Sequence, residues 1–289
     1  MRTMLIRGAL AVLTAVSLLA VAVPAASAAG PPSSGVNDWS CLPSSDHPEP
    51  VVLVHGLFAN ANDNFLTLAP ALAAHGYCVF SQTYGNGVLG PLVGGLAPME
   101  DSAAQLGAFV DRVRGATGAD RVDIVGHSEG STVPAYYLKF DGGAAKVDHF
   151  VGFGANYKGT TLDGLMTIAK ALGLGDVLRA VGCPACQEFM PGSAFLQKLD
   201  SGGVAVPGPT YTNIVSRYDE AVTPYTSGII DQPGASNVRN IVIQDRCAVD
   251  LTGHIGQAYD PNVINLILAA LDPAHPTPLN CQPFVDLGV

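Results

Sequence analysis

The sequence is poor in charged residues, and above all in positively charged ones. Only 13% of its 289 residues are charged, and 14 Lys and Arg stand against 24 Asp and Glu, which gives a net charge of −10. Nucleic acids and anionic membrane surfaces are bound through clusters of Lys and Arg. The composition therefore argues against both kinds of partner and favours neutral, partly apolar ones.

Long hydrophobic runs are absent after residue 28. Before it, Arg2 and Arg7 flank an apolar stretch at about residues 9–23, and Ala-Ser-Ala follows at 26–28. A short apolar core with such a cleavage site is typical of a secretory signal peptide rather than a membrane span. We therefore expect a signal peptide at 1–28 and a secreted, extracellular chain at 29–289. We expect this mature chain to be a single domain and a monomer, without an integral membrane span.

Cysteine is scarce, and all six cysteines lie after residue 28. An even number of cysteines in an exported chain indicates disulfides. The alternative is a zinc ion held by a C-x-x-C segment and two further cysteines, but a single C-x-x-C lacks the second close pair of a structural zinc site. We expect no metal and no cofactor. Proximity along the chain favours the disulfides Cys41–Cys78, Cys183–Cys186 and Cys247–Cys281.

The sequence does contain an alternation of strand and helix patterns. Continuous apolar runs of strand length alternate with segments of helical spacing, which predicts an α/β fold with a mostly parallel central sheet covered by helices on both faces. A linker rich in Pro and Ser precedes this region at 30–50, and a tail follows it at 272–289. Strands are expected at 50–56, 77–85, 121–128, 147–156, 210–219 and 238–247, and helices at 64–76, 99–118, 129–140 and 260–271.

The interval 157–200 departs from this alternation. Leu162, Leu165 and Met166 recur there at helical spacing, and a second apolar set follows at 174–181. We expect a small helical insertion between two strands. Its apolar faces either cover a binding crevice as a lid and form an acyl groove, or pack onto the sheet.

The strand pattern 121–128 ends abruptly in Gly126-His127-Ser128-Glu129-Gly130. The ligand crevice of an α/β sheet lies at the carboxyl ends of its strands. Glycines two residues before and after a serine permit a turn so tight that the hydroxyl projects into the crevice. The alternative is an ordinary glycine-rich turn. Because an apolar strand precedes the motif and a helix pattern follows it, we expect Ser128 to be a nucleophile.

A serine hydroxyl needs a base within hydrogen-bond distance before it can attack a carbonyl group. In chains of this organisation the base follows the last strand and the orienting acid follows the strand before it. His254 precedes the last helix pattern and is preferred to His275, which lies in the Pro-rich tail. Asp219 ends the strand pattern 210–219 and is the preferred acid; the alternatives are Glu220, Asp245 and Asp250.

Acyl transfer places negative charge on the carbonyl oxygen, so backbone N–H groups must already point at it. The N–H of Glu129, at the first turn of the helix after the serine, is one expected donor. The other comes from the loop after strand 50–56, where Leu57 is preferred to Phe58. The side chain of Glu129 either tunes the charge near His254 or pairs with a neighbour.

Four segments in this order resemble the class 2 (actinobacterial) secreted triacylglycerol lipases of the α/β-hydrolase superfamily. They are VVLVHGLFAN (51–60), VDIVGHSEGS (122–131), SRYDEAVTPYTSG (216–228) and GHIG (253–256). The resemblance covers nearly all of the mature chain and implies an α/β-hydrolase fold. It also implies a triad of Ser128, Asp219 and His254, and an oxyanion hole formed by Leu57 and Glu129.

The resemblance implies that the substrate is a lipid or another ester at a lipid–water interface. The residues expected to bind it are Phe58, Leu162, Leu165 and Met166. Hydrolysis of lipid esters through an acyl-enzyme is thus the expected function. The alternatives are an acyltransferase with the same three residues, an esterase directed at phospholipids or polyesters, and a binding protein without catalytic activity.

Overall fold

A computed structural model describes residues 35–87, 90–162 and 182–285. All of them lie in one compact unit. The predicted signal peptide, together with Leu165 and Met166, lies outside the described residues. No helix among the described residues is long and apolar enough to cross a membrane.

The core of the fold is a sheet of six strands in the order β2-β1-β3-β4-β5-β6, and every neighbouring pair is parallel. The predicted α/β fold with a parallel sheet is confirmed. The order reverses between β1 and β3, so the loops that leave these two strands meet at the same edge of the sheet. The strands are β1 Val51–Val54, β2 Val79–Ser81, β3 Val122–His127, β4 Val147–Phe153, β5 Thr210–Val215 and β6 Val238–Val242.

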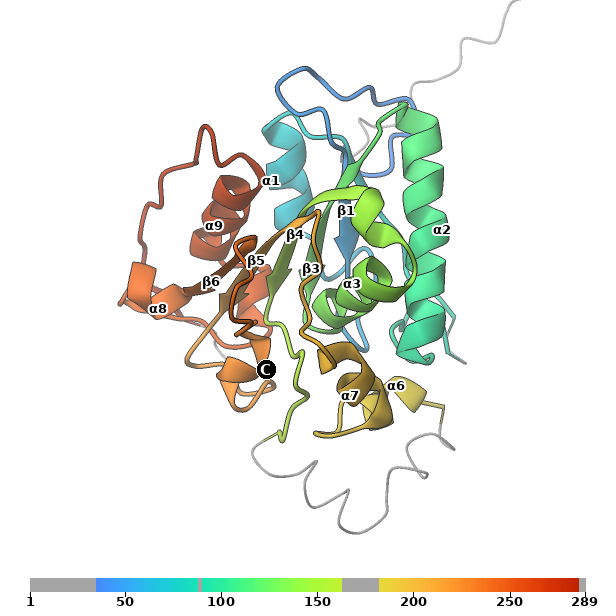
Figure 1. The fold of residues 1–289 in the computed structure, drawn as a ribbon. Helices are drawn as coiled ribbons and strands as arrows, with labels where there is room; N and C mark the ends of the chain where they lie inside the picture. Colours follow the sequence, from blue (N-terminus) through green and yellow to red (C-terminus); the bar gives the residue numbers. More distant parts are fainter. Residues whose placement is uncertain (1–34, 88–89, 163–181, 286–289) are drawn as a thin grey trace, which may run out of the picture. The chain divides into compact units, whose positions relative to one another are not determined.

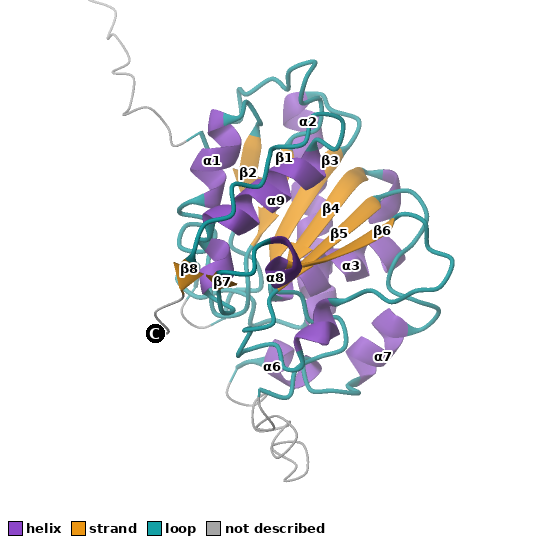
Figure 2. Cartoon of the chain, turned by 90° about the vertical axis from the view of Figure 1, so that its left-hand side faces the viewer, coloured by secondary structure: helices purple, strands orange, loops and turns teal. Residues whose placement is uncertain are grey.

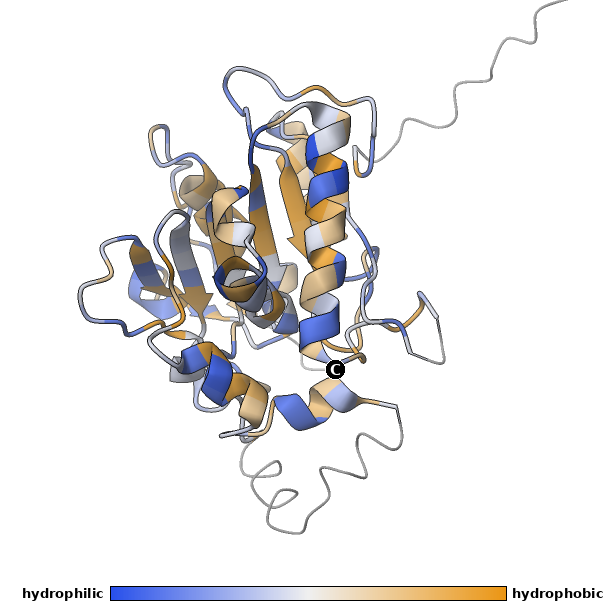
Figure 3. Cartoon of the chain, turned by 45° about the vertical axis from the view of Figure 1, so that its right-hand side comes forward, coloured by the Kyte–Doolittle hydropathy of each residue, from blue (hydrophilic) through white to orange (hydrophobic). Residues whose placement is uncertain are grey.

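Helices cover both faces of the sheet (Figures 1 and 2), because the strands are apolar on both sides. In β1, Val52 and Val54 face the core under α2 (Met99–Thr117) and α3 (Glu129–Phe140). Its residues Val51 and Leu53 face the opposite core, under α1 (Leu68–Ala74) and α9 (Pro261–Leu271). Figure 3 shows hydrophobic residues concentrated on the central strands and both kinds of residue along α2.

Several elements are shorter than their sequence patterns, among them α1 and β6. The helix expected at 64–76 begins only at Leu68, because Asn60 donates its N–H to the Asp63 carboxylate and closes a turn before it. The strand expected at 238–247 ends at Val242 and continues as the short helix α8 (Ile243–Arg246). The described residues also contain three 3₁₀ turns, at Gly143–Ala145, Tyr225–Gly228 and Gly256–Ala258.

The described part of the 157–200 insertion contains two short helices, α6 (Pro184–Glu188) and α7 (Ala194–Asp200). Beyond the sheet, β7 (Asp250–Leu251) pairs in parallel with β8 (Phe284–Val285), which ties the expected tail to the body. The six cysteines form the three expected pairs at disulfide distance, and no cysteine of the described residues is free to bind zinc.

Candidate active site

Ser128 lies in a sharp turn between β3 and α3. Its backbone has φ 56° and ψ −122°, a conformation that a non-glycine residue adopts only under strain. A Cβ atom at Gly126 would lie 1.7 Å from the carbonyl oxygen of Gly130. A Cβ atom at Gly130 would lie 1.9 Å from the carbonyl oxygen of Val54. Both glycines are therefore sterically required, and the turn presents the serine at the carboxyl edge of the sheet.

Three side chains from distant segments form a hydrogen-bonded row at this edge. Nε2 of His254 lies 2.9 Å from Oγ of Ser128, and Nδ1 lies 2.8 Å from Oδ2 of Asp219. All three residues are buried. With Nδ1–H donated to the carboxylate, Nε2 is free to accept the serine proton, as a general base must. His275 instead lies exposed in the tail, where it pairs with Asp272.

The carboxylate of Asp219 is fixed by four donors. Oδ1 accepts the N–H groups of Ala221 at 3.1 Å and Val222 at 2.7 Å. Oδ2 accepts Nε2–H of Gln257 at 3.0 Å in addition to the imidazole of His254. Because its remaining lone pairs are occupied, the carboxylate cannot rotate away from the imidazole without breaking these bonds.

The three alternative acids do not contact the imidazole. Glu220 accepts the backbone N–H of His254 at 2.9 Å. Asp245 forms an exposed ion pair with Arg217. Asp250 is fully buried but accepts bonds from the segment that follows it, at Thr252 and Asn262. Among the described residues, only Asp219 accepts a hydrogen bond from the ring.

Two backbone N–H groups near the serine are available to a negatively charged oxygen. Across the described residues, the N–H groups of Leu57 and Glu129 have no hydrogen-bond acceptor. The N–H of Phe58, by contrast, donates to the carbonyl oxygen of Gly94 at 3.1 Å. The structure therefore offers Leu57, rather than Phe58, as the donor from the loop after β1.

A cleft of about 350 Å³ opens beside the serine. It lies between the loop after β1 and the loop that carries His254. Phe58 lines this cleft and is 57% exposed, whereas Leu162 is not among the lining residues. The cleft is lined by Gly56, Leu57, Phe58, Ala59, Asp63, Asn64, His127, Ser128, His254, Ile255, Ala258 and Tyr259.

The side chain of Glu129 is fully buried beside the serine. Neither of its carboxyl oxygens has a hydrogen-bond partner within the described residues, so it does not pair with a neighbour there. Burial raises the pKa of this carboxyl well above its usual range, and the charge of Glu188 raises it further. Both effects favour the neutral acid next to Ser128, a feature that the sequence alone could not indicate.

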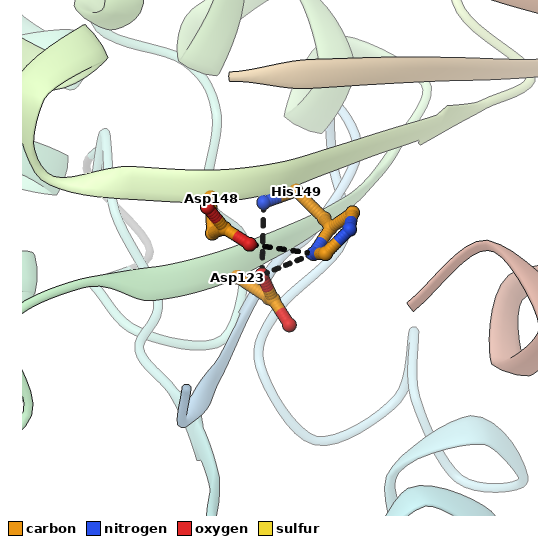
Figure 4. A group of neighbouring side chains, drawn as sticks. All are labelled: Asp123, Asp148 and His149. Atoms are coloured by element: carbon orange, nitrogen blue, oxygen red, sulfur yellow. Dashed lines mark hydrogen bonds and ion pairs between the residues drawn. The ribbon is translucent and has the colours of Figure 1, made fainter. Parts of the chain in front are cut away.

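A second cluster of ionisable side chains lies at the opposite, amino end of β3 and β4 (Figure 4). Nδ1 of His149 lies 3.2 Å from Asp123 and 3.3 Å from Asp148. Arg121 binds the other oxygen of Asp148 at 2.7 Å. Among the described residues, this is the one group whose His and Asp atoms converge as metal ligands would. Its charges are already paired with one another, which makes it a structural ion-pair cluster.

The sheet order and the serine turn between β3 and α3 define an α/β-hydrolase fold. The serine, the aspartate and the histidine at the carboxyl edge follow one another along the chain in the order that this fold requires. The chain belongs to the class 2 lipase family, whose sequence model matches residues 48–257.

Solved lipase structures share the fold at low sequence identity. Aspergillus fumigatus lipase B superposes with a TM-score of 0.61 at 19% identity, over 83% of this chain and 57% of that one. The present chain thus spans little more than half the length of that lipase. The mature Bacillus licheniformis lipase BlEst2 superposes with a TM-score of 0.51 at 16% identity, over 69% of this chain and 86% of that one.

Proposed function

We propose that the protein is a carboxylic ester hydrolase that cleaves lipid esters, with triacylglycerols as its substrate class. The observation that carries this proposal is the hydrogen-bonded row of Ser128, His254 and Asp219 beside an open cleft. Membership of the class 2 lipase family supports an ester substrate. The exposed Phe58 in the cleft supports an apolar one.

The reaction begins when Oγ of Ser128 attacks the ester carbonyl carbon and Nε2 of His254 takes its proton. The carbonyl π electrons move onto the oxygen, which accepts hydrogen bonds from the N–H groups of Leu57 and Glu129. The imidazolium is held in orientation by Asp219. It then protonates the alcohol oxygen as the C–O bond breaks. Water repeats the same steps on the acyl-enzyme and releases the fatty acid.

The proposed site of action is extracellular. Disulfides persist in oxidising compartments and are rare in the cytosol, and three cysteine pairs of this chain lie at disulfide distance. The apolar stretch at 9–23 between Arg2 and a small-residue segment supports export by the same reasoning.

Substitution of the serine tests the proposal. Purified wild type, Ser128→Ala and the exposed control Ser45→Ala are compared for release of fatty acid from emulsified trioctanoylglycerol and for labelling by a fluorophosphonate. We expect Ser128→Ala to lose turnover by about 10⁴-fold or more and to lose the label, because the acyl-enzyme forms on the hydroxyl of Ser128. Ser45→Ala should match the wild type.

Three results would contradict the assignment of the protein as an ester hydrolase that acts through Ser128. Substantial turnover by Ser128→Ala would show that another group attacks the ester. An unlabelled wild type without activity would favour a binding protein. If the wild type transferred most acyl groups to an added alcohol rather than to water, the acyltransferase alternative would replace hydrolysis.

A further inference from the structure

A chain of buried hydrogen bonds links the two loops that flank the cleft. Oδ1 of Asn64 accepts the N–H of Gly56 at 2.7 Å, and Nδ2 of Asn64 lies 3.0 Å from Nδ1 of His127. Nε2 of His127 lies 3.1 Å from the backbone carbonyl oxygen of His254. The side chains of Asn64 and His127 are both almost fully buried.

The partners at the two ends of this chain fix every donor and acceptor in it. Gly56 N–H can only donate, so Oδ1 of Asn64 is the acceptor and its NH₂ group faces His127. The carbonyl of His254 can only accept, so Nε2 of His127 carries the proton. Nδ1 of His127 is then the acceptor for Asn64. His127 is therefore a neutral imidazole with its proton on Nε2, in agreement with its burial, which lowers its pKa to about 3.

We propose that Asn64 and His127 are positioning residues that hold the loop of Leu57 in register with the loop of His254. This inference rests on the proposed function. It adds a physical connection between the two halves of the reaction, because Leu57 N–H stabilises the oxyanion and His254 moves the proton. Neither Asn64 nor His127 touches Ser128 Oγ or the triad carboxylate by a hydrogen bond.

The connection reaches both loops at the backbone. His127 holds the carbonyl of His254, and Glu220 holds its N–H at 2.9 Å, so both backbone polar groups of the base are bound. On the other side, a Cβ atom at Gly56 would lie 3.1 Å from Cβ of Ser128, so this loop is closely packed on the serine turn. Such a connection stabilises the relative placement of groups that must stay within about 0.5 Å of reactive geometry.

Kinetics of single and double variants test this connection. Asn64→Leu, His127→Phe and their double variant are assayed with p-nitrophenyl butyrate, beside Asn62→Leu, an exposed control on the same loop. We expect each single change to lower kcat on the order of 10- to 100-fold, as a misplacement near 1 Å does, with KM changed less than about threefold. The double variant should lose no more than the worse single one, since both changes break the same chain.

A conservative variant separates positioning from simple packing. His127→Gln keeps an N–H donor for the His254 carbonyl, whereas His127→Phe keeps the flat ring that stacks on Phe153 at 4.8 Å but donates nothing. We expect His127→Gln to recover most of the kcat that His127→Phe loses. If both have the same kcat, or if losses in the double variant multiply, the proposal is wrong.

A measurement on the wild type tests the proposal even if the variants do not fold. Nitrogen-15 NMR of the histidine rings should show His127 as the neutral Nε2–H form from pH 5 to pH 8. A proton on Nδ1, or titration of His127 in this range, would overturn the proposal. Failure of the proposed function gives a different result. The wild type would then neither hydrolyse esters nor react with the fluorophosphonate, and the connection would have no catalytic role.

Discussion

The two ends of strands β3 and β4 hold the same residue types in different arrangements. At the carboxyl end, His254 has a carboxylate on Nδ1 and a hydroxyl on Nε2. At the amino end, Nδ1 of His149 faces two carboxylates, those of Asp123 and Asp148. A partly buried histidine beside an aspartate is therefore not by itself a catalytic pair. A catalytic pair also needs a nucleophile beside the second ring nitrogen of its histidine.

The charges at the two ends differ accordingly. The hydrogen bond with Asp123 raises the pKa of His149, which favours the charged imidazolium in a local ion pair. Burial raises the pKa of Asp123, so this pair has a desolvation cost that its attraction to His149 offsets only in part. The amino end therefore holds a local ion pair, whereas the carboxyl end holds the proposed nucleophile.

The largest expected contrast comes from removing each histidine in turn. His254→Ala should lower kcat/KM for p-nitrophenyl butyrate by about 10⁴-fold or more, because Ser128 loses its base. His149→Ala should leave kcat/KM within about twofold but lower Tm, since it leaves buried Asp123 without its ring partner. Each kcal/mol lost lowers Tm by about 2–4 °C in a domain of this size. A large loss of activity in His149→Ala would refute the comparison.

The aspartates give the next contrast. Asp219→Asn keeps the shape of the side chain but offers an amide to the imidazole, which favours the wrong tautomer and should lower kcat by about 10⁴-fold. Asp148→Asn, at the amino end, should keep kcat near the wild-type value. Steady-state kinetics of both variants decide the point. Near-normal turnover by Asp219→Asn would transfer the role of the acid to Glu220, the nearest alternative.

The smallest expected effect is a pH dependence of stability. The raised pKa values of His149 and Asp123 both mean that the folded protein binds more protons than the unfolded chain. The stability contributed by charged His149 is present below its unfolded pKa of about 6.5 and is lost as pH rises through its folded pKa. The wild type should therefore lose Tm between pH 6 and pH 9 faster than Asp123→Asn/His149→Gln. Parallel melting curves would contradict this assignment.

The serine turn could be predicted from a local motif. Chain order predicted which types of residue would join the serine, an acid and a histidine, but did not decide between neighbouring candidates. The residues from Gly126 to Gly130 are contiguous, so the positions of the two glycines indicate a single tight turn. The atoms that make glycine necessary lie in this turn and in β1. Asp219 and Glu220 are neighbours in sequence, and only the fold shows that one meets the ring of His254 and the other its backbone N–H.

Other features left no trace in the sequence pattern. Asn64 and His127 are 63 residues apart, and no spacing rule connects them. The helix α1 starts later than its pattern predicts, because hydrogen bonds between Asn60 and Asp63 compete with helix formation just before it. Leu162 has a φ of 44° and does not line the cleft, although its helical spacing suggested a binding role.

The collision distances at Gly126 and Gly130 bear on how the proposed active site can be redesigned. A combinatorial library randomised over positions 126–130 should return glycine at both outer positions, because even alanine would drive a methyl group into a main-chain oxygen. At Gly115, on the surface of α2, an added methyl group meets nothing within 4 Å. New chemistry at this edge is therefore open to engineering through the residue at position 128 and the cleft walls, while Gly126 and Gly130 must stay glycine.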